Sequence, residues 1–440
     1  MSGSNWVEAS DPGQVAVGQA RIGWAERTMP VLGLIRDAFE REQPFAGLTV
    51  AACLHVTPET AVLVNLLTAG GAELHLAASN PLSTQDDIAA ALAASPAVKV
   101  HARSGVDRRT YYKHIHRALD AGPALVIDDG CDLVNTLHTE RQELLAGVRG
   151  GCESTTTGVA RLRRMAAEGT LAFPMVAADD SRTRRRFDNY LGTGQSVIDG
   201  ILRATNALLA GQVVVVAGYG SCGSGIAARA RGLGAQVIVT EVDPDRALEA
   251  LMEGFRVLPM AEAAPLGQLF ITATGSRDVV GRDHMAVMRD GAILANAGHF
   301  DVEVDVRALA GLAVAVHPSV RPHADEYQLD DGRRLILLAE GRVVNLVAAE
   351  GNPAAVMDLS FAVQALALAW LGNREGGGTL GPGPGGPADG EEGPLPAGVH
   401  DVPPEIDAQI AALALASLGT EIDALTPAQQ EYLDSWRQGS

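Results

Sequence analysis

Short apolar runs recur along the chain and alternate with longer segments whose apolar residues have helical spacing. The runs that read as buried strands are residues 48–54, 73–77, 124–127, 213–217, 237–240, 269–272 and 292–295. The intervening segments, such as 197–210 and 226–233, are rich in Ala, Leu and Ile. Regular alternation of apolar strands with helices is typical of α/β proteins with parallel sheets, because each crossover helix covers a sheet face. The pattern therefore predicts an α/β fold.

The two ends of the chain have a different pattern. Residues 24–39 have apolar positions at helical spacing, and Pro30 inside them predicts either a kink or the first turn of a helix. Residues 373–397 are rich in Gly and Pro, which indicates a flexible surface loop. Residues 401–440 predict a pair of terminal helices.

The most informative stretch is residues 212–243, where Gly218, Gly220 and Gly223 stand between an apolar strand and a helix in G-x-G-x-x-G spacing. Such glycines allow a tight turn, a close approach of the backbone to a pyrophosphate, and close packing of helix on strand. Glu241 ends the next strand, at the distance expected for an acid that binds a ribose 2′-hydroxyl. A carboxylate there would repel a 2′-phosphate, so NAD is favoured over NADP, although Arg246 nearby weakens that preference.

Composition narrows the class of protein. The chain has 440 residues, 47% hydrophobic content and a net charge of −19, which argues against nucleic-acid binding. We expect no membrane-spanning segment and no secretory signal, and therefore a cytoplasmic protein. Four cysteines without a C-x-x-C pair read as reduced thiols: Cys53, Cys131, Cys152 and Cys222.

Polar residues follow two of the predicted strands directly. Asp128, Asp129 and Asp132 come after residues 124–127, and His299 comes shortly after residues 292–295. Ligands of open α/β sheets bind at the carboxyl ends of strands, which favours a site at both places. A solvated turn and a structural histidine are the alternatives.

Several long motifs resemble the S-adenosyl-L-homocysteine hydrolase family. They occur in family order and cover about residues 25–372, with a weaker match at 398–433. The motifs are AACLHVTPETAV, NPLSTQDD, IDDGCDL, TTTGVARL, RFDNYLGTGQSVIDGILRATN, VAGYGSCGSG, TEVDP, ANAGHFDVEVDV and RRLILLAEGRVVNL. The resemblance implies two Rossmann-like, doubly wound parallel-sheet domains and a helical C-terminal segment.

The implied domain boundaries are a substrate-binding domain at residues 1–190, completed by 350–400, and an NAD-binding domain at 191–349. The segment 401–440 is implied to contact another subunit of a homo-oligomer, either a dimer or a tetramer. Neither nucleic acid nor a membrane is an expected partner.

The resemblance also implies the chemistry. NAD oxidises the ribose 3′-hydroxyl of an adenine nucleoside, a base removes the 4′-hydrogen, the 5′ substituent leaves by β-elimination, and water adds. The implied catalytic residues are His55, Asp129, Arg184, Asp188 and His299. The implied substrate contacts are Thr57, Glu59, Gln85, Ser154 and Asn352. The implied cofactor contacts, together with the fingerprint, are Thr155, Thr156, Thr157, Asn189, Gly218, Gly220, Ser221, Cys222, Gly223, Glu241, Arg246, Thr274, Gly298 and Asn345. No metal is implied.

Some positions depart from the family motifs. Arg184 replaces a lysine that helps to deprotonate the 3′-hydroxyl, and a guanidinium cannot act as that base. Ser154 replaces a glutamate that binds the ribose hydroxyls, Thr193 replaces a cysteine, and Asn352 replaces a histidine. The chain stops at Ser440 without the Lys and Tyr of the family tail, so sealing of the cofactor site by a neighbouring subunit is in doubt.

These departures gather around the sugar, while His55, Asp129 and His299 are kept. The leading hypothesis is therefore a diverged enzyme that dehydrates an altered adenine nucleoside to a 4′,5′-unsaturated product, as in nucleoside-antibiotic biosynthesis. The first alternative is a true S-adenosyl-L-homocysteine hydrolase. The second is a non-catalytic NAD-binding regulator.

Overall fold

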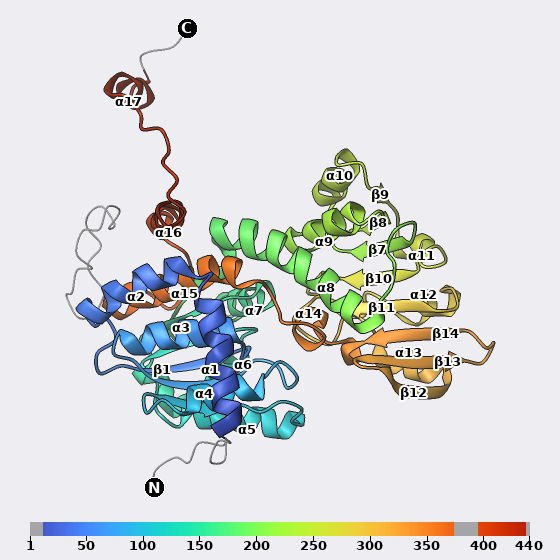
Figure 1. Cartoon of the computed structure of the whole chain (residues 1–440), viewed down its shortest axis with the longest axis horizontal. Coiled ribbons are helices and arrows are strands. Elements are labelled where there is room, and N and C mark those ends of the chain that lie inside the picture. The colour runs from blue at the N-terminus through green and yellow to red at the C-terminus, as the bar shows by residue number, and fades with distance from the viewer. Residues whose placement is uncertain (1–11, 374–394, 437–440) are drawn as a thin grey trace.

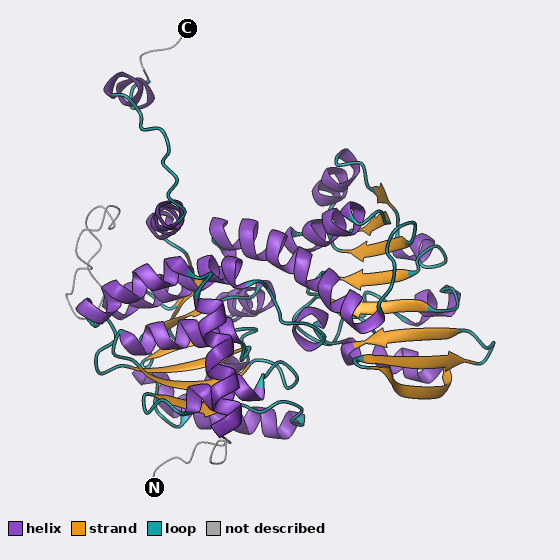
Figure 2. Ribbon diagram, viewed as in Figure 1, coloured by secondary structure: helices purple, strands orange, loops and turns teal. Residues whose placement is uncertain are grey.

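Two α/β domains, each built on one sheet, make up the computed structural model, which describes residues 12–373 and 395–436 (Figures 1 and 2). Most of the predicted Gly/Pro-rich loop lies outside the described residues. The α/β prediction is confirmed, and each strand predicted from an apolar run is present within one or two residues of its expected bounds.

The sheet of the first domain is entirely parallel, in the order β15-β6-β5-β4-β1-β2-β3. Its strands are β1 (Thr49–Leu54), β2 (Glu73–Ala78), β3 (Val98–His101), β4 (Leu125–Asp128), β5 (Gly150–Glu153), β6 (Pro174–Ala177) and β15 (Gly398–Asp401). The chain winds outward from β1 in one direction and from β4 in the other. The strand order therefore reverses between β1 and β4, where open α/β sheets form ligand crevices.

Alternating side chains of β1 build two cores, one on each face of this sheet. Val50, Ala52 and Leu54 pack into one cluster, and Ala51 and Cys53 pack into the other. The first cluster is covered by α1 (Pro12–Glu26), α2 (Pro30–Glu42), α3 (Pro58–Ala69), α4 (Asp86–Ala93) and α15 (Ala354–Asn373). The second is covered by α5 (Arg108–Leu119), α6 (Asp132–Glu140) and α7 (Thr156–Ala167), with the short 3₁₀ turn η1 (Gln142–Gly147) beside them. A second 3₁₀ turn, η2 (Ala178–Asp180), follows β6, and its Ala178 packs into the first cluster.

Two of the sequence predictions concern helices of this domain. Pro30 is the first residue of α2 and follows a break after Glu26, so it begins a helix and does not kink one. The sequence predicts no membrane-spanning segment, and one helix, α15, is long and apolar enough to cross a membrane by length and composition alone. Two thirds of that stretch are buried against the sheet and its neighbouring helices, as in a core helix.

The sheet of the second domain has the order β12-β13-β14-β11-β10-β7-β8-β9. Its strands are β7 (Val213–Ala217), β8 (Gln236–Thr240), β9 (Arg256–Val257), β10 (Leu269–Thr272), β11 (Ala292–Asn296), β12 (Ala313–Arg321), β13 (Ala324–Leu329) and β14 (Arg334–Leu338). Its strand order reverses between β7 and β10, so this sheet also has a crevice position. β12 and β13 are antiparallel additions at one edge that the sequence pattern did not predict.

The helices of this domain are α9 (Ser221–Gly232), α10 (Pro244–Met252), α11 (Met260–Ala263), α12 (Arg282–Val287) and α13 (Val306–Leu312). Two connections join the domains (Figure 1). One is a π-helical segment, η3 (Arg184–Thr193), which continues into α8 (Gly194–Thr205). The other runs through η4 (Ala339–Gly341) and α14 (Val344–Val347) into α15.

After α15 the chain returns to the first sheet as β15 and ends in α16 (Pro404–Ser417) and α17 (Pro427–Leu433), so the predicted terminal helix pair is confirmed.

Candidate active site

A cavity of about 380 Å³ lies where the carboxyl ends of the two sheets face each other. Predicted site residues line it from both domains. They are His55, Thr57, Glu59, Asp129, Ser154, Thr155, Thr156, Thr157, Arg184, Asp188, Asn189, Gly220, Ser221, Cys222, Arg246, Thr274, Gly298, His299, Asn345 and Asn352. Segments far apart in sequence therefore converge on one cavity.

The remaining predicted site residues do not line the cavity. Gly218 and Gly223 shape the turn behind it, since a Cβ on Gly223 would lie 1.9 Å from the carbonyl oxygen of Gly218. Glu241 directly follows β8, and its carboxylate accepts hydrogen bonds from the backbone N–H groups of Tyr219 and Val242 beside that turn. Gln85 lies in a neighbouring cavity, where its side-chain oxygen accepts a hydrogen bond from Arg21.

His55 follows β1 at the reversal of strand order. Its Nδ1 is 2.7 Å from Ser83 Oγ and 3.1 Å from Ser79 Oγ. Ser83 Oγ lies 3.2 Å from the Asn80 carbonyl, to which it donates, so it accepts from His55 Nδ1–H. This network assigns the imidazole proton to Nδ1 and leaves Nε2 as an acceptor. Burial, with help from His299 and Arg184, lowers the pKa of His55 to about 3, so the ring is neutral.

Asp129 follows β4, across the same reversal from His55. Burial raises the pKa of its carboxyl to about 7, against the opposing effect of Arg184. Ser154 Oγ donates a hydrogen bond to Asp129 Oδ1. A carboxyl with a pKa near neutrality can both accept and return a proton at physiological pH, as general acid–base catalysis requires.

His299 comes from the loop after β11 and brings the second domain against the first. Its ring centroid lies 5.6 Å from that of His55. A Cβ on Gly130 would lie 2.4 Å from His299 Nε2, so this approach depends on the glycine, whose φ is +102°. Burial lowers the pKa of His299 to about 4, so this imidazole is neutral as well.

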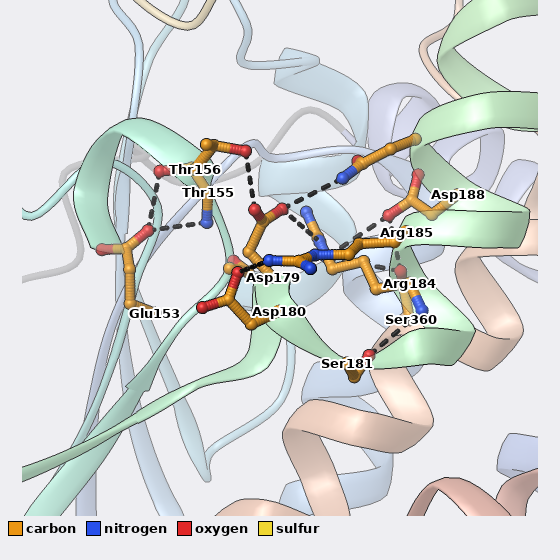
Figure 3. Close-up of polar contacts among 12 residues, drawn as sticks. Glu153, Thr155, Thr156, Asp179, Asp180, Ser181, Arg184, Arg185, Asp188 and Ser360 are labelled. Atoms are coloured by element: carbon orange, nitrogen blue, oxygen red, sulfur yellow. Dashed lines mark hydrogen bonds and ion pairs between the residues drawn. The ribbon is translucent and has the colours of Figure 1, made fainter. Parts of the chain in front are cut away.

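Arg184 and Asp188 project from η3 into a polar network (Figure 3). The Arg184 guanidinium lies 3.3 Å from a carboxylate oxygen of Asp188 and 3.3 Å from one of Asp179. Asp188 also accepts hydrogen bonds from Ser360 Oγ and Asn352 Nδ2. Burial alone would lower the pKa of Arg184, but Asp188, Asp179 and Asp129 raise it, so the guanidinium keeps its proton.

Comparison with known proteins identifies the family. The family model for S-adenosyl-L-homocysteine hydrolase matches residues 7–147, and the model for its NAD binding domain matches residues 189–351. The chain is 52% identical to an adenosylhomocysteinase of Thermosynechococcus vestitus over 433 residues, which cover 98% of this chain and 97% of that protein. The chain belongs to the S-adenosyl-L-homocysteine hydrolase family.

Two further relatives show how names vary within this family. An adenosylhomocysteinase of Aquifex aeolicus is 54% identical over 423 residues, covering 96% of this chain and 97% of that protein. A protein of Methanocaldococcus jannaschii named S-inosyl-L-homocysteine hydrolase is 50% identical over 424 residues, covering 96% and 97%. The family resemblance and the NAD cofactor expected from the sequence are thus confirmed.

The residues of the second domain fit NAD, the cofactor of the family. Gly220 is the N-cap residue of α9 and provides no side-chain cap, and the atom nearest to a Cβ placed on it is Arg246 Nη1 at 3.4 Å. The helix terminus is therefore open for a pyrophosphate. Burial holds the pKa of the Cys222 thiol at about 12, so no thiolate competes there. Asn345 Oδ1 is buried and lacks a partner among the described residues, as expected of an atom that bonds a ligand.

Three of the residues that depart from the family motifs contact one another or share a partner. Asn352 Nδ2 donates to Thr193 Oγ1 at 3.1 Å and to Asp188, and Asp188 pairs with Arg184. Arg184, Thr193 and Asn352 are therefore connected through one network in the cavity, separate from the Ser154–Asp129 contact.

Sequence reasoning missed several residues of the site. Asp179 accepts from Thr156 Oγ1 at 2.6 Å and from Asn189 Nδ2 at 3.2 Å, and so connects predicted cofactor residues to Arg184. Asp179 could have been predicted from the sequence, because it comes shortly after the apolar residues 174–177, as Asp129 comes shortly after residues 124–127. Ser83 and Ser360 had no comparable signal, since only the fold brings them to His55 and Asp188.

Proposed function

We propose that the protein is an NAD-dependent hydrolase that cleaves S-adenosyl-L-homocysteine to adenosine and homocysteine. The proposal rests on one observation: three groups suited to proton transfer line the same cavity as the glycine-rich turn. They are the neutral imidazoles of His55 and His299 and the carboxyl of Asp129, whose pKa is about 7. Relatives that match nearly the full chain at about 50% identity and bear the name adenosylhomocysteinase support it.

Bound NAD would supply the oxidising equivalent at the ribose 3′-carbon and receive it back at the end of each turnover. Arg184 would stabilise negative charge on the 3′-oxygen, because its guanidinium stays protonated. Asp188, held by Ser360 and Asn352, would accept the 3′-hydroxyl proton. In this arrangement the carboxylate performs the deprotonation and the arginine provides the charge.

Ionised Asp129 would accept the 4′-proton, which the 3′-ketone makes acidic, and return it after water has added. His55 would handle the proton at the 5′ position through Nε2, since Nδ1–H is held by Ser83. The sulfur would leave as the thiolate, and the neutral imidazole would take a proton from the water that then adds at the 5′-carbon. The protonated ring would pass that proton to the thiolate or to solvent and so return to its neutral form. His299 completes the enclosure from the second domain, and exclusion of water protects the ketone.

Thiol release from S-adenosyl-L-homocysteine by the purified, NAD-loaded protein tests this proposal. We expect catalytic release of homocysteine together with adenosine. The Asp129→Asn variant serves as the matched control, since it should bind the nucleoside without releasing thiol. Absence of thiol from the native protein with NAD demonstrably bound would overturn the hydrolase proposal.

A second function is favoured by the network of Arg184, Thr193 and Asn352 around Asp188. The same elimination chemistry, applied to an adenine nucleoside with an altered sugar and a 5′-hydroxyl, would expel water and give a 4′,5′-unsaturated nucleoside. The relatives support the hydrolase more strongly, and they give no support to a place in antibiotic biosynthesis.

Mass spectrometry on a panel of adenine nucleosides tests this second function through the loss of one water. The Arg184→Lys variant provides the comparison. If the arginine adapts the site to an altered sugar, the lysine variant should lose dehydration activity and gain thiol release. A lysine variant that dehydrates faster than the native protein would count against this function.

A further inference from the structure

Two buried carboxyl groups that the proposed reaction does not use lie side by side behind Asp129. Asp128 ends β4 and Glu153 ends β5, and the two residues are partners in the parallel register of these strands. Register partners in adjacent parallel strands are about 5 Å apart and point to the same face of the sheet. Both residues are completely buried.

Each carboxyl group uses one oxygen to hold a loop of the active site. Asp128 Oδ2 accepts from the Val134 amide at 2.8 Å, at the start of α6. Glu153 Oε1 accepts from the Gly130 amide at 2.9 Å and from both the amide and the hydroxyl of Thr155 at 2.8 Å, the latter two shown in Figure 3. The pair therefore fixes both the loop that carries Asp129 and the turn that carries Ser154 and Thr155.

The other oxygen of each group, Asp128 Oδ1 and Glu153 Oε2, is buried and has no hydrogen-bond donor among the described residues. Two ionised carboxylates in this position would repel each other without solvent or a donor to offset the cost. A proton between them would supply the missing donor to both unpartnered oxygens. We propose that Asp128 and Glu153 share one proton and act as a positioning pair for Asp129.

The surroundings agree with a single shared proton. The titratable groups that face the pair are mostly acids or thiols: Asp129, Asp132, Cys53, Cys131, Cys152 and Tyr111. The cation that acts on Asp128 is Arg161 of α7, and its guanidinium is already bonded to Asp132 Oδ1 at 2.9 Å and to the Gly130 carbonyl. Burial raises the pKa of both Asp128 and Glu153 well above the ordinary carboxyl range.

Glycine at position 158 makes room for this arrangement. A Cβ on Gly158 would lie 2.2 Å from the carboxyl carbon of Glu153. The start of α7 therefore packs directly on the carboxyl group, which leaves no space for a water molecule on that side. A proton shared with Asp128 would satisfy Glu153 Oε2 without a water molecule on that side.

If the pair holds one proton, it carries one negative charge next to Asp129. Variants that change the charge of the pair can show whether it carries none, one or two negative charges. Glu153→Gln keeps the oxygen that holds Gly130 and Thr155, and its amide can donate to an ionised Asp128, so the charge of the pair is unchanged. We expect the acid limb of the rate–pH profile to keep its midpoint in this variant. The double variant Asp128→Asn with Glu153→Gln removes the charge, so the midpoint should move to lower pH.

Two results would contradict a single shared proton. A shift of the midpoint in Glu153→Gln alone would mean that both groups are ionised, and no shift in the double variant would mean that both are protonated. Glu153→Ala tests positioning: it should lower kcat about 100-fold with little change in KM, because the Asp129 loop loses its anchor. Retention of activity in Glu153→Ala would overturn the positioning role.

A second readout needs no turnover and so remains decisive if the proposed function, on which the role of Asp129 rests, proves wrong. The folded pair retains a proton that the unfolded chain releases above about pH 4, so this pair lowers the stability of the native protein as pH rises. The unfolding temperature of Glu153→Gln, minus that of the native protein, should therefore increase between about pH 5 and about pH 9. Infrared spectra should also lose a carboxylic-acid carbonyl band in Glu153→Gln. If the difference in unfolding temperature stays constant with pH and the infrared spectrum of Glu153→Gln is unchanged, the proposal is overturned.

Discussion

Burial moves the proton affinities of His55 and Asp129 in opposite directions. It lowers the pKa of the imidazole to about 3 and raises that of the carboxyl to about 7, because burial disfavours the charged form of either group. At neutral pH the site therefore holds a neutral imidazole and a carboxyl group close to its pKa, which the proposed reaction would use at the 5′ and 4′ positions of the nucleoside. Elimination and its reversal need these two states together.

The proton affinity of Asp129 predicts the pH dependence of the reaction. Proton removal requires the ionised carboxyl, so kcat/KM should fall as pH drops through about 7, whereas neutral His55 and His299 contribute no limb above about pH 5.

The stability of the folded protein should change with pH in the opposite direction from the rate. The raised pKa costs stability as pH rises from about 4 to about 7, so Asp129→Asn should unfold at a higher temperature than the native protein at pH 8. Rate–pH profiles and thermal unfolding check both, and an acid limb centred near pH 4 would contradict the assignment.

Side chains that act at the end of their own strand could be predicted from the sequence, and those that act across the fold could not. Asp129 and His299 were identified because each follows an apolar run. Ser83 meets His55, and Ser360 meets Asp188, only because distant segments pack together. Gln85 was expected at the substrate, but Arg21 from α1 holds its side chain in the neighbouring cavity.

At the scale of elements, the strands β7 and β8 were predicted within one residue, because their apolar runs leave few alternatives. The helix between them, α9, begins at Ser221, five residues before the predicted 226, because its first turn is made of Gly, Ser and Cys instead of the Ala-rich sequence that marked the helix. The antiparallel edge was not predicted. β12 is mostly exposed along its length, so its sequence carries little of the apolar signal that marks a buried strand. The sequence of the short strand β5 (Gly150–Glu153) does not predict a strand either, because two of its residues are glycines.

Close packing of α9 on η3 gives a prediction at this scale. A Cβ on Gly225 would lie 2.0 Å from the carbonyl oxygen of Tyr190, a backbone atom that cannot move aside without shifting η3. Gly225→Ala should therefore destabilise the protein by about 1–3 kcal/mol and weaken retention of NAD, because the start of α9 moves with it. Thermal unfolding and cofactor content after gel filtration measure the two effects.

The same helix offers the control for this prediction. A Cβ on Gly232, near the end of α9, would meet nothing within 4 Å. Gly232→Ala should leave NAD retention unchanged and add up to about 1 kcal/mol of stability, as alanine favours a helix over glycine. Equal behaviour of the two variants would show that the contact with η3 is unimportant.

At the scale of the whole molecule, the C-terminal arm (residues 418–436) projects away from both domains (Figure 1). All residues of α17 are exposed, and several large apolar side chains of the arm are exposed to solvent, among them Leu418 and Ile422 at 75% and Trp436 at 89%. Apolar side chains gathered on a projecting segment mark an interaction site. We expect the arm to pack on a second copy of this chain, in agreement with the homo-oligomer expected from the sequence.

Loss of apolar contacts from the arm should therefore dissociate the oligomer. The triple variant Leu418→Asp, Ile422→Asp and Trp436→Ala should reduce the molar mass in solution, measured by light scattering at several protein concentrations, and leave the fold of both domains intact. A variant with Glu421→Gln and Asp423→Asn changes the same arm without touching its apolar side chains, so it should keep the native mass. If the native protein is already monomeric at every concentration, or the triple variant keeps the native mass, the arm is not the contact.

NAD retention in the triple variant then separates two roles of the arm. Loss of cofactor together with mass would mean that the second copy helps to close the cofactor site, and loss of mass alone would mean that the arm serves assembly only.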